Sequence, residues 1–259
     1  MEEAKMPLTE HLSELRKRIV VPLVCICLAF IITFYFSENI FNLLSFPLKS
    51  ELKLKLNSPY VQIIEKTSSP LKSLVFLRPA EALWMHFKIA FVASLIINLP
   101  LIFYQFWRYV SPGLLAREKK FLLPFLFSST GLFLLGVLFC FLIVLPFALS
   151  FLFGYKTQNL VPMIAVGHYI DFALKFILAF GLVFELPLII VFLTKFGFVT
   201  PQKLTRFRKY AVLLAFVAAA ILTPTPDAFN QTLMAGPIIL LYEVGILLSK
   251  IMYRKKDNG

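Results

Sequence analysis

The chain has 259 residues, of which 59% are hydrophobic and 29 are phenylalanine, and its mean hydropathy is +0.82. This composition excludes a soluble domain and is typical of a polytopic membrane protein. The net charge of +12 does not indicate binding to nucleic acid, because the basic residues cluster beside apolar segments, as the positive-inside rule expects.

The first 86 residues predict a cytoplasmic amphipathic helix, one span and a cap. Residues 1–18 are polar, with leucines recurring on one helical face, and residues 19–37 are free of charge for long enough to cross a bilayer once. Residues 38–86 are polar and rich in proline, which predicts a structured outer cap with short helices. Within them, Pro79-Ala80-Glu81 marks the start of the next helix.

Five further apolar segments follow, at 89–107, 121–155, 172–194, 211–222 and 230–249. The segment 211–222 rises only about 18 Å as a helix, well short of a hydrocarbon core of about 30 Å. We therefore predict a single all-α membrane domain over 1–259, with six transmembrane helices, the last two short, arranged as a concave bundle.

The distribution of Lys and Arg predicts the orientation. The N-terminus, the loop 108–120, the loop 195–209 and the tail 250–259 together hold 17 basic residues, whereas the short connectors 156–170 and 223–229 hold one. By the positive-inside rule both termini are cytoplasmic.

Glu185 lies in the middle of the apolar segment 172–194. An ionised carboxylate at that depth costs several kcal/mol, so it is neutral, paired or facing water. Pro187 removes a backbone donor two residues later and predicts a bend. We weigh a functional role for this acid ahead of simple hydrogen bonding to a neighbouring helix.

The sequence contains no motif for nucleotide, metal or nucleophilic chemistry. Its three cysteines lie within apolar runs and its three histidines are scattered. We predict no catalytic residue, no metal and no cofactor, and hence no enzyme.

Five groups of residues together resemble the TatC family, the receptor subunit of the twin-arginine protein translocase. They are HLSELRKR, FLRPAEALWMHFKIA, SPGLLAREKKFLLPF, FGLVFELP, and ILTPTPDAFNQ followed by GPIILLYEVG. The resemblance runs from residue 11 to 245 in the family's order and spacing.

The resemblance implies that Glu14 and Glu118 bind the consecutive arginines of a signal peptide on a folded substrate protein, with Arg16 orienting Glu14. A carboxylate among cations can make a bidentate contact with a guanidinium that lysine cannot reproduce. The alternatives are an i,i+4 pair of Glu14 with Arg18 and a solvated Glu118.

The resemblance also implies a place and a set of partners. The place is the prokaryotic cytoplasmic (inner) membrane. The partners are single-span TatA/TatB-type subunits, further copies of the chain within the complex and the lipid bilayer, with transport powered by the proton-motive force. Asp227, Asn230 and Gln231 match the polar cluster where partners dock, although helix capping explains at least one of them as well. Leu213, on the short helix, is expected to contact the same partner.

The main rival is a proton-coupled secondary transporter with Glu185 as the proton carrier. That class is expected to show internal repeats with broken helices at matching positions. The sequence shows no such repeat. A membrane-protein insertase is a second rival, but no basic residue within a polar groove is evident.

Overall fold

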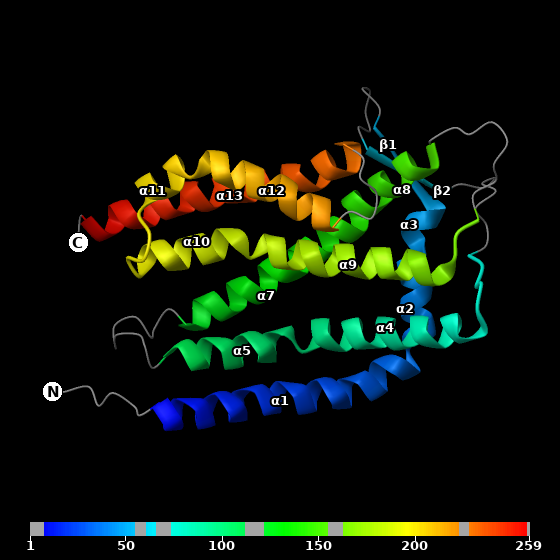
Figure 1. The fold of residues 1–259 in the computed structure, drawn as a ribbon, viewed down its shortest axis with the longest axis horizontal. Helices are drawn as coiled ribbons and strands as arrows, with labels where there is room; N and C mark the ends of the chain where they lie inside the picture. The colour runs from blue at the N-terminus through cyan, green and yellow to red at the C-terminus, as the bar shows by residue number, and fades with distance from the viewer. Residues whose placement is uncertain are drawn as a thin grey trace. The chain divides into compact units, whose positions relative to one another are not determined.

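A computed structural model describes residues 8–54, 61–65, 74–111, 122–154, 163–222 and 228–257, and of residues 8–14, 49–54, 61–65, 153–154 and 254–257 the backbone alone. The described chain is predominantly helical (Figure 1). Its elements are α1 Leu8–Tyr35, α2 Ser37–Leu44, α3 Phe46–Lys49, β1 Ser50–Leu54, β2 Val61–Glu65, α4 Pro79–Ile97, α5 Leu99–Val110, α7 Leu122–Phe139, a π-helical segment Cys140–Val144, α8 Leu145–Gly154, α9 Val166–Phe184, α10 Leu186–Lys195, α11 Pro201–Arg206, α12 Arg208–Leu222 and α13 Ala228–Asp257.

Within the described residues, five helical stretches are long and apolar enough to cross a membrane. They are Leu15–Tyr35, Pro79–Ile97, Leu122–Leu152, Val166–Lys195 and Ala228–Tyr253. The predicted all-α polytopic membrane fold is therefore confirmed, while the count of six spans stays a prediction, because α12 has only 15 residues. The expectation of two short final helices holds for α12 and is wrong for α13, which has 30 residues because it continues into the basic tail.

The chain divides into two compact units, one formed by Met1–Phe41 and Leu83–Gly131, the other by Asn42–Ala82 and Leu132–Gly259. In the first unit α1 packs against α5. The predicted N-terminal amphipathic helix is not separate from the first span, since α1 runs without interruption from Leu8 to Tyr35. A helix start at Pro79 is confirmed, but the expected span 89–107 is divided where α4 ends at Ile97.

The predicted outer cap contains the two short helices α2 and α3, as expected, and also an antiparallel hairpin of β1 and β2. Its register pairs Ser50 with Glu65 and Leu54 with Val61. The β-branched residues of VQIIE favour a strand. The prediction of the cap, which used its proline content, did not take this signal into account.

In the second unit, α10 and α12 both lie along α13 (Figure 1). Tyr169 of α9 donates a hydrogen bond to the carbonyl of Leu44 at the end of α2. The largest fully buried side chains of this unit include Phe176 and Phe180 of α9. Helix α9, which ends one residue before Glu185, thus contributes large side chains to the core of this unit.

Candidate functional site

The N-terminal part of α1 presents the basic residues of the HLSELRKR motif. Arg16 and Lys17 are exposed, while Arg18 is half-buried. Glu14 occupies the same helical turn, but its side chain lies outside the described residues, as does the whole of Glu118. The position of Glu14 on a continuous helix follows from the backbone, because α1 begins at Leu8.

The described helix ends on either side of residues 112–121, the range that includes Glu118, contact each other. Trp107, near the end of α5, is buried and stacks on Phe125 near the start of α7, with ring centroids 5.3 Å apart and planes inclined by 28°. Arg108 donates a hydrogen bond to the hydroxyl of Tyr104. Aromatic stacking of this kind stabilises the approach of the end of α5 to the start of α7. Sequence reasoning missed this contact, although the two aromatic residues were the available signal.

The end of α5 and the first turns of α1 lie in one unit. Leu15 and Arg18 of α1 line the same cavity as Gln105, Phe106 and Tyr109 of α5. The structure therefore brings the helix of Glu14 next to the segment that leads into the Glu118 loop.

Glu185 lies at a break between two helices. This agrees with the bend that Pro187 predicts. α9 ends at Phe184, α10 begins at Leu186, and Glu185 itself has φ −73° and ψ −17°. Its backbone N–H donates to the carbonyl of Leu182 in a short 3₁₀-like turn. The residue is only 7% exposed, so the carboxylate faces neither lipid nor open water but is enclosed by protein.

Two glycines allow neighbouring helices to approach this break. A Cβ on Gly136 of α7 would lie 2.6 Å from the carbonyl oxygen of Phe180, and one on Gly245 of α13 would lie 2.6 Å from the Cδ1 of Ile190 and 3.2 Å from the Cα of Pro187. Any larger residue would move a helix away. The helices around Glu185 are therefore held close together at these two glycines. No single sequence motif predicts this packing.

The predicted partner-docking residues lie on α12 and α13. Leu213 is 61% exposed, in line with an apolar face available to another helix. Asn230 is buried at 3% exposed, and the amide nitrogen of Gln231 donates to the carbonyl of Phe216 at 3.1 Å, which joins α13 to α12. Asp227 lies outside the described residues. The side chain of Gln231 is thus engaged in a hydrogen bond within the chain.

The sequence analysis gave Glu243 no role, yet it forms an ion pair. Arg208, at the start of α12, approaches the Oε2 of Glu243 to 2.6 Å. The neighbouring Tyr242 donates its hydroxyl proton to the carbonyl of Leu204 in α11 at 2.8 Å. Together these contacts fix the turn between α11 and α12 onto α13.

Glu81 also does more than begin α4. Its Oε2 accepts from the backbone N–H of Leu77 at 2.8 Å, and its Oε1 accepts at 2.7 Å from the N–H of Gly167, at the start of α9. Ala165, the N-cap residue of α9, makes no capping hydrogen bond with its side chain. Glu81 supplies that cap from 86 residues away in sequence. Beside it, Val75 and Ala165 form a parallel bridge that joins the segment before α4 to the segment before α9.

Among the residues whose positions are described, no three His, Cys, Asp or Glu side chains come together as metal ligands.

Three comparisons agree on the relatives of the chain. The family model described as Sec-independent protein translocase protein (TatC) matches residues 10–237. The TatC protein of Aquifex aeolicus (strain VF5) is 42% identical over 255 residues, which cover 98% of both chains. That of Carboxydothermus hydrogenoformans is 38% identical over 259 residues, covering 100% of this chain and 99% of the other.

Solved structures give the same result. A crystal structure of the twin-arginine translocase receptor TatC matches with a TM-score of 0.75 and 38% identity, covering 93% of this chain and 99% of that one. A second, of the same receptor in DDM, matches with a TM-score of 0.78 and 39% identity, covering 92% and 99%. The fold and the identity extend over nearly the whole chain. This protein therefore belongs to the TatC family, is a multi-pass membrane component of a Sec-independent protein translocase, and is not an enzyme.

Proposed function

We propose that this chain is the receptor subunit of a twin-arginine translocase, in which Glu14 and Glu118 bind the paired arginines of signal peptides on folded substrates. The observation that carries the proposal is its likeness, at 38% identity over 93% of its length, to a solved protein described as a twin-arginine translocase receptor. Both acids lie within the part that the family model matches.

The local chemistry supports that assignment. Glu14 and Glu118 each stand among cations, in the stretches ELRKR and REKK. Each carboxylate can accept two parallel N–H bonds from one guanidinium, whereas the ammonium of lysine makes only a point contact. The surrounding lysines and arginines repel a basic peptide that is wrongly placed, so the site selects geometry and not charge alone. The exposed Arg16 is suited to orient Glu14.

The same proposal extends to the partner subunits of the complex and to the energy source of transport. The exposed apolar side chains of α12 form a face for single-span subunits of the TatA/TatB type; they are Val212, Leu213, Leu214, Val217 and Ile221. Asp227, Asn230 and Gln231 would border that face at the outer end. Both termini would lie in the cytoplasm of a prokaryotic inner membrane, several copies would assemble in the complex, and the proton-motive force would drive transport.

A second candidate, a proton-coupled secondary transporter, is favoured by one observation. Glu185 is a buried acid at a helix break inside an apolar span, a geometry that such transporters use for coupling ions.

A binding assay tests the receptor proposal. The purified protein is presented with a signal peptide bearing Arg-Arg and with the same peptide bearing Lys-Lys, and bound peptide is measured. We expect the arginine peptide to bind at least about tenfold more tightly, since a charge-assisted bidentate contact contributes about 1.5–3 kcal/mol. Its binding should weaken with salt, because exposed charges are screened over about 10 Å at 0.1 M. Equal binding of the two peptides would contradict the proposal.

A further inference from the structure

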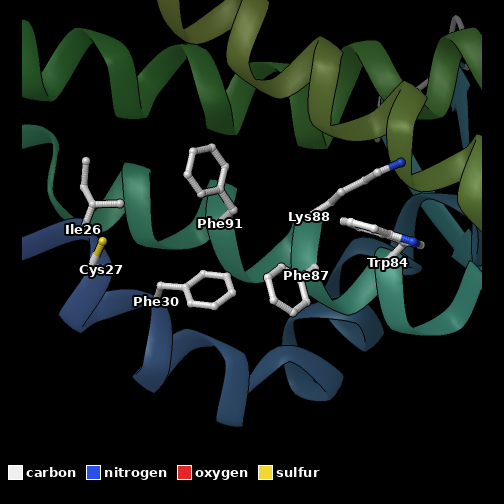
Figure 2. A pocket seen from close by; sticks show the side chains of 7 residues that line it. All are labelled: Ile26, Cys27, Phe30, Trp84, Phe87, Lys88 and Phe91. Atoms are coloured by element: carbon white, nitrogen blue, oxygen red, sulfur yellow. The ribbon is translucent and has the colours of Figure 1, made fainter. Parts of the chain in front are cut away.

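The first compact unit has a long apolar groove between α1 and the pair α4 and α5. It consists of two adjoining cavities of about 430 Å³ and 460 Å³. Ile26, Cys27 and Phe91 line both cavities, so the two are continuous. Figure 2 shows the first cavity, with Ile26, Cys27 and Phe30 on α1 facing Phe87 and Phe91 on α4.

Contacts at one end of this groove hold the two helices together. The hydroxyl of Thr33 lies 2.8 Å from the carbonyl oxygen of Ala90 on α4. The ring of Phe87 lies 5.1 Å from that of Phe30 and 5.5 Å from that of Phe34. The groove extends from this cluster toward Pro22, which lies inside α1 and lines the second cavity. A proline within a helix bends it, which leaves space beside α1.

The opposite end of the groove is polar and basic. Arg18, Gln105 and Tyr109 line the second cavity there. Three further basic side chains are exposed at this end of the same helices; they are Arg16, Lys17 and Arg108. The other lining side chains are mostly aliphatic and aromatic, and Lys88 is the one basic residue that lines the first cavity. A molecule that matches this pattern has a long apolar chain and a negatively charged head.

We propose that the groove binds an anionic phospholipid, with an acyl chain along Ile26, Cys27 and Phe91 and its phosphate at Arg18. A guanidinium binds phosphate through paired hydrogen bonds, and basic clusters beside a membrane span attract anionic lipid head groups. If the N-terminus is cytoplasmic, as proposed above, this lipid belongs to the cytoplasmic leaflet.

Shape and charge favour a lipid over a peptide helix. A flexible acyl chain can follow both cavities in sequence. A signal peptide with paired arginines would also place its cations next to Arg18, where like charges repel.

Native mass spectrometry of the purified full-length protein tests this site. The protein in detergent is titrated with phosphatidylglycerol or with phosphatidylcholine, and lipid adducts are counted. We expect one phosphatidylglycerol to remain bound under conditions that strip phosphatidylcholine. Arg18→Gln should weaken that adduct about fivefold to tenfold, while the matched control Arg206→Gln, whose side chain is exposed and does not line the groove, should leave it unchanged. Equal losses in both variants would overturn the site in favour of diffuse attraction to the basic surface.

A second pair of variants tests the acyl part of the groove. Cys27→Trp places a large ring at a position that lines both cavities, whereas Leu28→Trp adds the same ring at an adjacent exposed position that lines neither. We expect Cys27→Trp alone to remove the adduct. Retention of the adduct in Cys27→Trp would place the lipid elsewhere. Equal retention of the two lipids by the wild-type protein, or protection of Cys27 from a maleimide by a signal peptide but not by phosphatidylglycerol, would overturn the proposal.

Discussion

Two apolar segments of this protein break in the same way, and the residue at each break differs. Asn98-Leu99-Pro100 separates α4 from α5, and Glu185-Leu186-Pro187 separates α9 from α10. The backbone angles are similar, with φ −86° and ψ 3° at Asn98 against φ −73° and ψ −17° at Glu185. In both cases the proline two residues on cannot donate to the helix ladder.

The side chains at the two breaks differ in whether they can donate a hydrogen bond to a helix carbonyl. The amide nitrogen of Asn98 donates to the carbonyl of Ser94 at 2.8 Å, one turn back in its own helix. An ionised carboxylate cannot donate to a helix carbonyl, so Glu185 cannot be satisfied in this way. Its charge must be stabilised by other groups or removed by protonation. The same break is therefore structural at Asn98 and a candidate for function at Glu185.

Substitution of Glu185 should have the largest effect. Glu185→Gln should retain substantial transport, because an amide keeps a polar group in the break, whereas Glu185→Leu should reduce transport by an order of magnitude or more. Asn98→Leu, the matched change at the other break, should cost about 1 kcal/mol of stability through one lost hydrogen bond and leave transport intact. Export assays with expression and peptide binding measured in parallel distinguish these outcomes.

The proton-carrier alternative predicts another order for the Glu185 variants. Glutamine cannot titrate, so Gln and Leu variants would be equally inactive. Complete loss of transport in both, with signal-peptide binding intact, would contradict our interpretation of Glu185.

The packing around the Glu185 break should be sensitive to one methyl group. Gly136→Ala places a Cβ 2.6 Å from a backbone carbonyl oxygen of α9 and should lower the free energy of unfolding by about 1–3 kcal/mol. Gly131→Ala in the same helix meets nothing within 4 Å and should be neutral or stabilising by up to about 1 kcal/mol. Thermal unfolding in detergent compares the two variants, and equal stability would show that α7 does not approach α9 this closely.

Glu81 provides a carboxylate whose donors are known. Glu81→Ala removes the acceptor for the backbone N–H groups of Gly167 and Leu77 and should destabilise the start of α9, because a helix that loses its cap leaves a backbone donor without an acceptor. Glu81→Gln keeps one acceptor and should recover part of that loss. Hydrogen exchange at the Gly167 amide is the direct measurement. Unchanged protection in Glu81→Ala would exclude the capping contact between α4 and α9.

The Arg208–Glu243 ion pair should matter least. Both side chains are well exposed, at 47% and 38%, and such pairs contribute about 0.2–1 kcal/mol. Glu243→Gln should therefore change the midpoint of chemical denaturation only slightly and should not affect transport. A large loss of transport would assign Glu243 a role beyond this contact.

These residues show what the sequence could predict. The break at Glu185 followed from Pro187, because a missing backbone donor is a local property. The presence of several long apolar helices was accessible in the same way, from the length and composition of the apolar segments. The cap that Glu81 provides to α9 could not be predicted, because its partner is 86 residues away in sequence. An acid in the first turn of a helix is already explained by its interaction with the helix dipole. The roles of Gly136 and Gly245 depend on which helices pack together, which composition does not encode. The β-hairpin in the outer cap was missed for a different reason, since short strands inside a proline-rich segment carry weak periodicity.

The central claim is that two acids at one face of this TatC-family protein recognise paired arginines. The most direct measurement is the affinity of an Arg-Arg signal peptide for the wild-type protein, for the Glu14→Ala, Glu118→Lys double variant, and for Glu10→Ala, a control one turn from Glu14 and outside the HLSELRKR motif. We predict that the double variant loses both affinity and the preference for Arg-Arg over Lys-Lys, while Glu10→Ala keeps them. Wild-type affinity and preference in the double variant would contradict the claim.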